Sequence, residues 1–153
     1  MTDRSLVNTL VEYHPIFIPY VMIIESDQEL ATMLQRALKQ EMKIGTIFAR
    51  TMSDALNIAR ALCPSLFLIN THLTGGDGLT LVDLLRQNSI LASVPVVLLT
   101  TDAHSYQMQA EARRITCLHI PAELDSILST IKDHLPTHNR EEESITPLPQ
   151  MQS

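Results

Sequence analysis

Short, continuous apolar runs alternate five times with segments of helical periodicity along this chain of 153 residues. A strand buried on both faces of a parallel sheet gives an unbroken apolar run, whereas a covering helix repeats its apolar residues every three or four positions. The alternation predicts one α/β domain, a three-layer sandwich with a parallel five-stranded sheet between helices. The predicted strands are residues 21–24, 44–49, 66–69, 94–99 and 117–120. The predicted helices are 27–41, 105–114 and 123–135, with two more around Leu56 and Val82.

Composition excludes several classes of protein. The net charge is −6 with only 11 Lys and Arg residues and no basic block, so this chain alone is not expected to bind nucleic acid. Cys63 and Cys117 lack a CxxC spacing, which favours reduced core cysteines over a disulfide or a zinc site. No apolar stretch approaches the ~20 residues that span a bilayer, and no signal peptide precedes the domain. We therefore expect a cytoplasmic location and no membrane partner.

The ends of the chain differ in composition from its middle. Residues 1–19 form an N-terminal extension that is interrupted by Pro15 and Pro19. Residues 20–135 carry the alternating pattern of the predicted domain. Residues 136–153 hold the acidic run 141–143 and two prolines among polar residues, which predicts a flexible tail.

Polar residues or breaks follow four of the predicted strands. Because the carboxyl ends of parallel strands meet at one edge of a sheet, where α/β folds bind ligands, these residues should lie together. Ser26 and Glu29 also fit a capping box, which predicts that Ser26 is the N-cap of the first helix. The residues at the expected edge are Glu25, Ser26, Asn70, Thr100, Ile120 and Pro121.

These positions and their spacing resemble response-regulator receiver domains of the CheY type, the phosphoryl-accepting modules of two-component signalling. The resemblance covers residues 20–135. Asn70 lies 45 residues after Glu25 and 30 before Thr100, and 75–78 reads Gly-Gly-Asp-Gly, as the family's G-x-D-G does. Thr74 replaces a usual proline, and the segment from Thr100 to Pro121 is about two residues short. The resemblance implies a flavodoxin-like fold of strand order 2-1-3-4-5.

The same comparison predicts a degenerate pseudo-receiver that lacks the phosphoacceptor aspartate. In the family, carboxylates bind magnesium, an aspartate attacks phosphorus, and a lysine and a hydroxyl take up charge. Here Asn70 is a poor nucleophile, Ser26 replaces a carboxylate and Ile120 replaces the lysine. Glu25 is at most a weak remnant of the metal site. We therefore expect no catalytic residues, no enzymatic activity, no cofactor, and weak or lost magnesium binding.

Two residues of the predicted site can also be explained without a functional role. Asn70 has an alternative role as a hydrogen-bonded turn residue, and Thr100 as a strand end without function. The histidines His72, His104 and His119 show no metal-binding spacing.

The leading functional hypothesis is a stand-alone receiver-like module of a two-component or phosphorelay system that acts by protein–protein interaction without aspartyl phosphorylation. Its expected partner is a histidine kinase, an output protein or a transcription component, and a homodimer is possible. Cys117 occupies the switch position, where receivers often place an aromatic residue. The alternatives are a response regulator with a non-standard acceptor, or a small-molecule sensor at the carboxyl-edge cleft. The candidate partner face consists of Met108, Ile115, Cys117 and His119.

Overall fold

A computed structural model describes residues 19–135 and contains the predicted parallel five-stranded sheet. The order of its strands, β2-β1-β3-β6-β7, confirms the expected order 2-1-3-4-5. Every neighbouring pair of strands in this sheet is parallel. The strands are β1 (Tyr20–Ile24), β2 (Gly45–Ala49), β3 (Leu66–Asn70), β6 (Val96–Thr100) and β7 (Thr116–His119).

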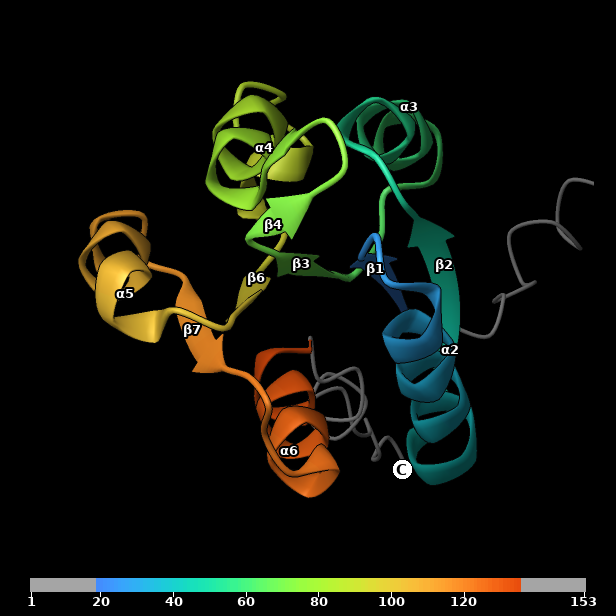
Figure 1. The fold of residues 1–153 in the computed structure, drawn as a ribbon. Helices are drawn as coiled ribbons and strands as arrows, with labels where there is room; N and C mark the ends of the chain where they lie inside the picture. The colour runs from blue at the N-terminus through green and yellow to red at the C-terminus, as the bar shows by residue number, and fades with distance from the viewer. Residues whose placement is uncertain (1–18, 136–153) are drawn as a thin grey trace, which may run out of the picture.

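Helices cover both faces of the sheet, as Figure 1 shows. Three lie on one face: α3 (Met52–Leu62), α4 (Gly78–Leu85) and α5 (Ala103–Ala112). Two lie on the other: α2 (Gln28–Ala37) and α6 (Leu124–His134). The three-layer α/β sandwich predicted by the alternating pattern is therefore confirmed.

The core forms two apolar clusters, one on each side of the sheet. Successive residues of a strand point to opposite faces, so Met22 packs under α3 and α4 while Ile23 packs under α2 and α6. Neither side chain is exposed at all. Burial on both faces is the physical reason that the central strands appear in the sequence as unbroken apolar runs.

Three local features differ from the sequence-based expectation. The loop after β3 contains an antiparallel pair, β4 (His72–Leu73) with β5 (Gly76–Asp77), where only a turn was expected. The first helix ends in a π-helical turn, Leu38–Met42. Strand β7 begins and ends one residue earlier than predicted, so Ile120 follows the strand.

The prediction of core cysteines is wrong for Cys63, which is exposed. It terminates α3 in the left-handed conformation, with φ of 46°, and the helix end lies at the surface. Cys117 is half-buried in β7, and both cysteines are free. The hydroxyl of Tyr20 donates a hydrogen bond to the neighbouring carbonyl of Leu62.

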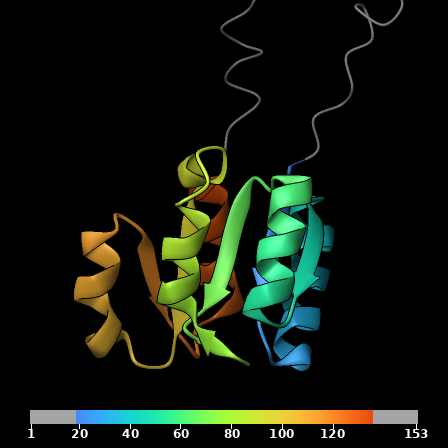
Figure 2. The same ribbon diagram turned by 90° about the horizontal axis from the view of Figure 1, so that it is seen from above.

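All strands of the sheet run in one direction, so its two edges differ (Figure 2). The described chain starts and ends at the amino edge, where β1 begins and α6 ends. The loops that follow the strands lie at the opposite, carboxyl edge. The predicted extension 1–19 lies outside the described residues except for Pro19, and so does the whole predicted tail 136–153. None of the helices within 19–135 is long and apolar enough to cross a membrane.

Candidate functional site at the carboxyl edge

Three residues predicted for the site end neighbouring strands of the sheet. Glu25 follows β1, Asn70 ends β3, and Thr100 ends β6. The register aligns Ile24 with Ile69, which brings the side chains of Glu25 and Asn70 together. Glu25 is 3% exposed and Thr100 is fully buried, so the polar atoms of both need partners within the protein.

Asn70 satisfies Glu25 directly. Its Nδ2 donates a hydrogen bond of 2.6 Å to Oε1 of Glu25, while the backbone N–H of Asp27 donates to Oε2 at 3.0 Å. The other half of the amide, Oδ1, accepts a hydrogen bond of 2.9 Å from the backbone N–H of His72. A carboxylate at position 70 could accept the second bond but could not donate the first. The side chain of Asn70 therefore joins a buried anion to the turn after β3. It has the predicted role of a hydrogen-bonded turn residue and also donates a hydrogen bond to Glu25.

The close approach of helix α4 holds this turn in place. The backbone N–H of Gly78 donates to the carbonyl of Thr71 at 2.8 Å. A Cβ atom added at Gly78 would lie 2.4 Å from the backbone carbonyl oxygen of Asn70, which is too close for any side chain. The last glycine of the Gly-Gly-Asp-Gly turn is thus needed for space directly behind the site, and Asp77 caps α4 through Leu79.

The prediction that Ser26 is the N-cap of the first helix is wrong. Asp27 caps α2, because its Oδ1 accepts hydrogen bonds from the N–H groups of Glu29 and Leu30 at 2.9 and 3.3 Å. The two candidate caps are adjacent, and aspartate is at least as good a cap as serine. The hydroxyl of Ser26 instead donates to the carbonyl of Arg50 at 3.0 Å and accepts from the N–H of Thr74 at 2.7 Å. It joins the loops that follow β2 and β3.

The hydroxyl of Thr100 is occupied by its own loop. Its Oγ1 accepts a hydrogen bond of 2.9 Å from the N–H of Asp102, and its carbonyl accepts one of 2.8 Å from the N–H of Ile120. The side chain of Ile120 is 8% exposed and belongs to the core cluster beneath α6. The peptide bond between Ile120 and Pro121 is cis. A hydrocarbon therefore packs into the core at the position of the family's lysine.

Sequence reasoning missed a second group of side chains at this edge. The rings of His72 and Tyr106 meet edge to face with centroids 6.2 Å apart, and Nδ1 of His72 lies 3.1 Å from the hydroxyl of Thr71. Burial raises the pKa of Tyr106, and the charges of Asp77 and Asp102 raise it further. Tyr106 is the aromatic residue of α5, whose other large hydrophobic residue is Met108, and this was the signal in the sequence that could have pointed to the contact.

The metal-binding capacity of the edge can be judged from its oxygen atoms. Both carboxylate oxygens of Glu25 and Oδ1 of Asn70 accept hydrogen bonds from N–H groups, and the hydroxyl of Ser26 already has two partners. Within 19–135, no group of three or more His, Cys, Asp or Glu residues could hold a metal ion. The donor set is unlike the cluster of carboxylates that magnesium prefers.

The predicted partner face is only partly accessible. Met108 on α5 is 77% exposed and His119 on β7 is also exposed, whereas Cys117 between them is half-buried. Burial raises the pKa of the Cys117 thiol. Including Ile115 was wrong: it is 8% exposed and packs in the core beneath α5, because the chain turns inward there to begin β7.

Comparisons with known proteins agree with this architecture. Residues 21–131 match the family model of the response regulator receiver domain. The polar-differentiation response regulator DivK of Brucella ovis is 30% identical over 121 residues, covering 75% of this chain and 94% of DivK. The chemotaxis protein CheY4 of Vibrio cholerae has a similar structure, with a TM-score of 0.71, 19% identity, and coverage of 78% of this chain and 100% of CheY4. A putative response regulator from Chloroflexus aurantiacus also reaches 0.71, with 22% identity over 76% of this chain and 97% of that protein.

Proposed function

Because the chain belongs to the response-regulator receiver family, we propose that it acts in a two-component pathway by binding a partner protein, without accepting a phosphoryl group at position 70. The proposal is that of a pseudo-receiver: the fold presents a recognition surface, and its surface properties do not depend on aspartyl phosphorylation. We propose that it has no enzymatic activity.

The hydrogen bond between Asn70 and Glu25 carries this proposal. A receiver transfers a phosphoryl group to a carboxylate oxygen, which must be a nucleophile and must face the donor. The amide nitrogen of Asn70 is not nucleophilic, and it is held 2.6 Å from a buried carboxylate that repels an incoming phosphate. Two features thus oppose the transfer, one chemical and one electrostatic.

Magnesium is proposed to bind weakly or not at all. In a receiver the ion would draw the phosphate oxygens toward the acceptor and offset their charge. In this chain the nearby oxygens serve the turns after β1 and β3, so binding the ion would require breaking several of the hydrogen bonds of Glu25, Ser26 and Asn70. The site is better suited to holding the loops than to holding an ion.

The partner is proposed to dock on the face that contains Met108 and His119. Met108 is the most exposed large hydrophobic residue within 19–135, and an unbranched thioether adapts readily to different binding surfaces. A histidine kinase, an output protein, a transcription component or a second copy of the chain could supply the complementary surface.

A phosphorylation assay tests the proposal. The native chain is incubated with a small acyl phosphate and magnesium, and its intact mass is measured. We expect no added phosphoryl mass. The triple variant Ser26→Asp, Asn70→Asp, Ile120→Lys restores the family's residues and serves as the positive control, expected to gain an alkali-labile phosphoryl group. Circular dichroism verifies that this variant is folded.

An alkali-labile phosphoryl group on the native chain would overturn the proposal. A second arm addresses the partner face in a strain that lacks the gene. Signalling restored by Asn70→Leu but not by Met108→Glu, with both variants verified as folded by circular dichroism, would support partner binding through this face. Signalling restored by Met108→Glu but not by Asn70→Leu would indicate that the function depends on the carboxyl edge.

A further inference from the structure

Positive charge is concentrated in a groove between α2 and the outer strand β2. Arg36, Lys39 and Lys43 line it together with Gln35, Ile44, Gly45 and Thr46, and no carboxylate does. The cavity has a volume of ≈ 680 Å³. These three cations are among only 11 Lys and Arg residues in a chain of net charge −6. We call this surface, defined by the seven residues named here, the basic groove.

The local structure explains why the cations converge. Arg36, Lys39 and Lys43 follow one another at intervals of three and four residues, which places them on one side of α2 and of the π-helical turn that ends it. Nε2 of Gln35 donates a hydrogen bond of 3.1 Å to the hydroxyl of Thr46, which fixes the helix to β2 and sets the floor of the groove. Lys43 adopts the left-handed conformation, with φ of 53°, where the chain turns into the strand.

No salt bridge among the described residues involves these three cations. All three cationic side chains are exposed, and the salt bridge found within 19–135 lies elsewhere, between Arg113 and Asp83. Strand β2 is also an outer strand of the sheet, with no strand of the described chain on its far side. The groove thus offers cations beside a strand whose outer side pairs with no strand of residues 19–135, a combination that suits an acidic peptide segment.

The chain carries such a segment within reach. Residues 141–143 are three consecutive glutamates, which lie six to eight positions beyond Leu135. Leu135 packs against the same core cluster as Ile44, which lines the basic groove. An extended chain of six to eight residues spans about 20 to 28 Å. That exceeds the ~10 to 12 Å diameter of the helix that it would have to cross.

We propose that the basic groove is the docking surface for the acidic run Glu141–Glu143 of the chain's own C-terminal segment. Exposed ion pairs are individually weak, but tethering raises the effective concentration of the segment to the millimolar range, so a weak contact is populated. The contact weakens as salt is added, because the charges on both sides are exposed.

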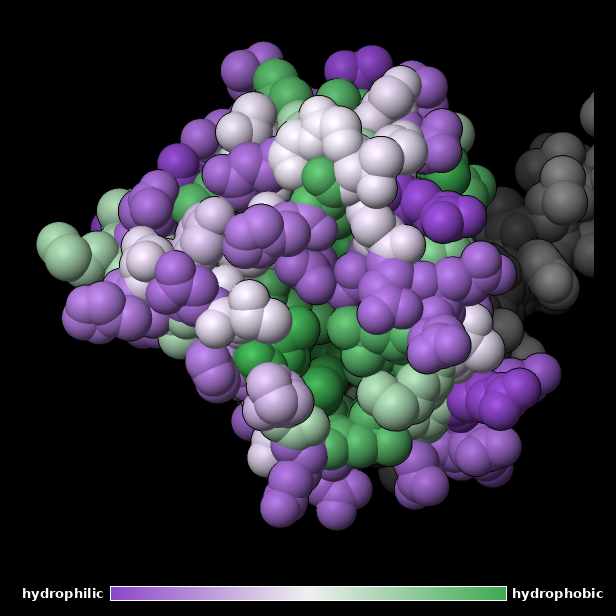
Figure 3. All heavy atoms as spheres, viewed as in Figure 1, coloured by the Kyte–Doolittle hydropathy of each residue, from purple (hydrophilic) through white to green (hydrophobic). Residues whose placement is uncertain are grey.

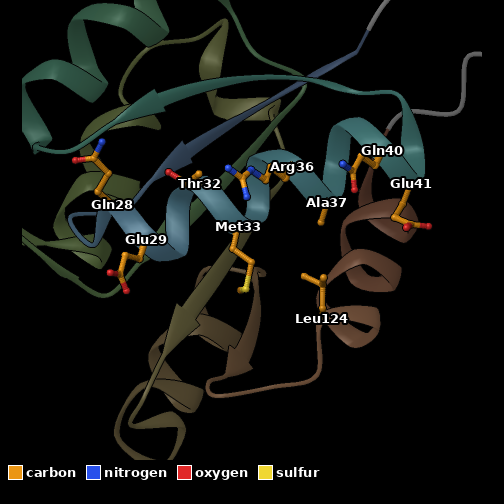
Figure 4. A pocket seen from close by; sticks show the side chains of 9 residues that line it. All are labelled: Gln28, Glu29, Thr32, Met33, Arg36, Ala37, Gln40, Glu41 and Leu124. Carbon is orange, nitrogen blue, oxygen red and sulfur yellow. The ribbon is translucent and has the colours of Figure 1, made fainter.

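Docking there would affect a neighbouring surface. Arg36 also lines a second groove of ≈ 470 Å³ along α2 on the side of α6, which includes Met33 and Leu124. Figure 4 shows Met33 and Leu124 facing one another across that groove, and Figure 3 shows hydrophobic side chains exposed between the two helices. Met33 is 45% exposed. The docking surface proposed for the acidic run therefore adjoins this apolar surface at Arg36.

Zero-length cross-linking of the full chain tests the proposal. A carbodiimide joins a lysine amine to a carboxylate that touches it, and peptide mass spectrometry locates the link. We expect links from Lys39 or Lys43 to Glu141, Glu142 or Glu143 at low salt, reduced at least fivefold at 1 M salt. An equal mixture of isotopically light and heavy chains should give links of a single isotope only. The triple variant Glu141→Gln, Glu142→Gln, Glu143→Gln should abolish them, and Lys132→Gln on α6 should leave them unchanged.

Amide chemical shifts measured by NMR give a second readout that needs no cross-linking reaction. In the full chain, the triple glutamine variant should shift the amide signals of Arg36, Lys39, Lys43 and Thr46 and leave those at the carboxyl edge in place. Unchanged amide signals, or links confined to Lys132, would overturn the proposal. Links of mixed isotope would also overturn it, because they would assign the groove to the tail of a second copy.

Discussion

Asn70 supplies a donor and an acceptor that an aspartate at the same position could not both supply. Glu25 is 3% exposed and accepts one of its hydrogen bonds from the amide nitrogen of Asn70. The amide oxygen of Asn70 accepts a hydrogen bond from the turn after β3. A buried carboxylate without its donors is costly. At the scale of single residues, the amide is therefore part of what allows an acid to remain at the end of β1.

Asn70→Asp should destabilise the fold at neutral pH by about 1 to 3 kcal/mol, because Glu25 loses its donor and gains a like charge in contact. Urea unfolding of the variant and of the native chain at pH 7 measures the difference. The control is Asn88→Asp, whose amide only accepts hydrogen bonds, from Ile90 and Leu91, and which should lose little stability. An equal loss in both variants would contradict the account.

Single positions show how far the sequence could predict the site. The spacing located Glu25, Asn70 and Thr100 at one edge, because each follows a strand whose apolar run is unmistakable. It could not choose between Ser26 and Asp27 as the helix cap, since both are good caps and the choice depends on where the first helical turn closes. The sequence also could not predict that Ile115 is buried, because its exposure depends on where α5 meets the sheet.

Helices α4 and α5 are joined at their C-terminal ends by a bidentate ion pair. Nε and Nη2 of Arg113 donate to the two carboxylate oxygens of Asp83 at 2.8 and 2.9 Å. The hydrogen bond from Arg113 lowers the pKa of Asp83, and the same bond raises the pKa of Arg113. Because α5 carries Met108, this contact between elements sets the position of the proposed partner face.

Asp83→Asn should reduce stability at neutral pH by less than about 1 kcal/mol, because the carboxylate is 54% exposed and solvent screens the pair. A lowered pKa in the folded state means that the charged form stabilises folding above the ordinary carboxyl range of about 4. The contribution is lost as the pH falls through the lowered pKa. Thermal unfolding of variant and native chain should therefore converge at acidic pH. A difference that persists there would contradict an electrostatic origin.

Elements with strong periodicity were predicted well, and those set by local chain geometry were not. Apolar runs located the five strands of the sheet and their order followed from the family resemblance, but the pattern carried no sign of the β4–β5 pair, whose strands are two residues long. The π-helical turn Leu38–Met42 keeps the apolar spacing of an α-helix while changing its hydrogen bonds. Boundaries shifted by one or two residues, as expected where an end depends on a single hydrogen bond.

At the scale of the whole molecule, the three positions at which the receiver resemblance predicts charged side chains lie at both the edge and the core. Ile120 is 8% exposed and packs in the cluster beneath α6, whereas Ser26 and Asn70 hold loops on the surface above it. A lysine at position 120 would bring an ammonium group to an edge with one carboxylate already committed to an amide. The three positions are therefore expected to depend on one another energetically.

Ile120→Lys alone should cost about 2 kcal/mol of stability, mainly through lost apolar burial. Added to a chain that already carries Ser26→Asp and Asn70→Asp, the same change should cost less, with a coupling of about 0.5 to 3 kcal/mol. A cycle of these variants, each unfolded in urea at pH 7, measures the coupling. Strict additivity of the stability changes would show that the three positions are not energetically coupled.

The two ends of the described segment have a practical consequence for protein engineering. Residue 19 precedes β1 and residue 135 follows α6, so both lie at the amino edge, opposite Glu25 and Asn70. Ends that lie at one edge can be joined, and exposed loops elsewhere can be opened, to give a circular permutant of the described domain. A fluorescent protein or an immobilisation tag attached at residue 19 or 135 would be joined at the edge opposite Glu25 and Asn70. The molecule can thus be anchored to a sensor surface by one edge while its opposite edge is screened for binding.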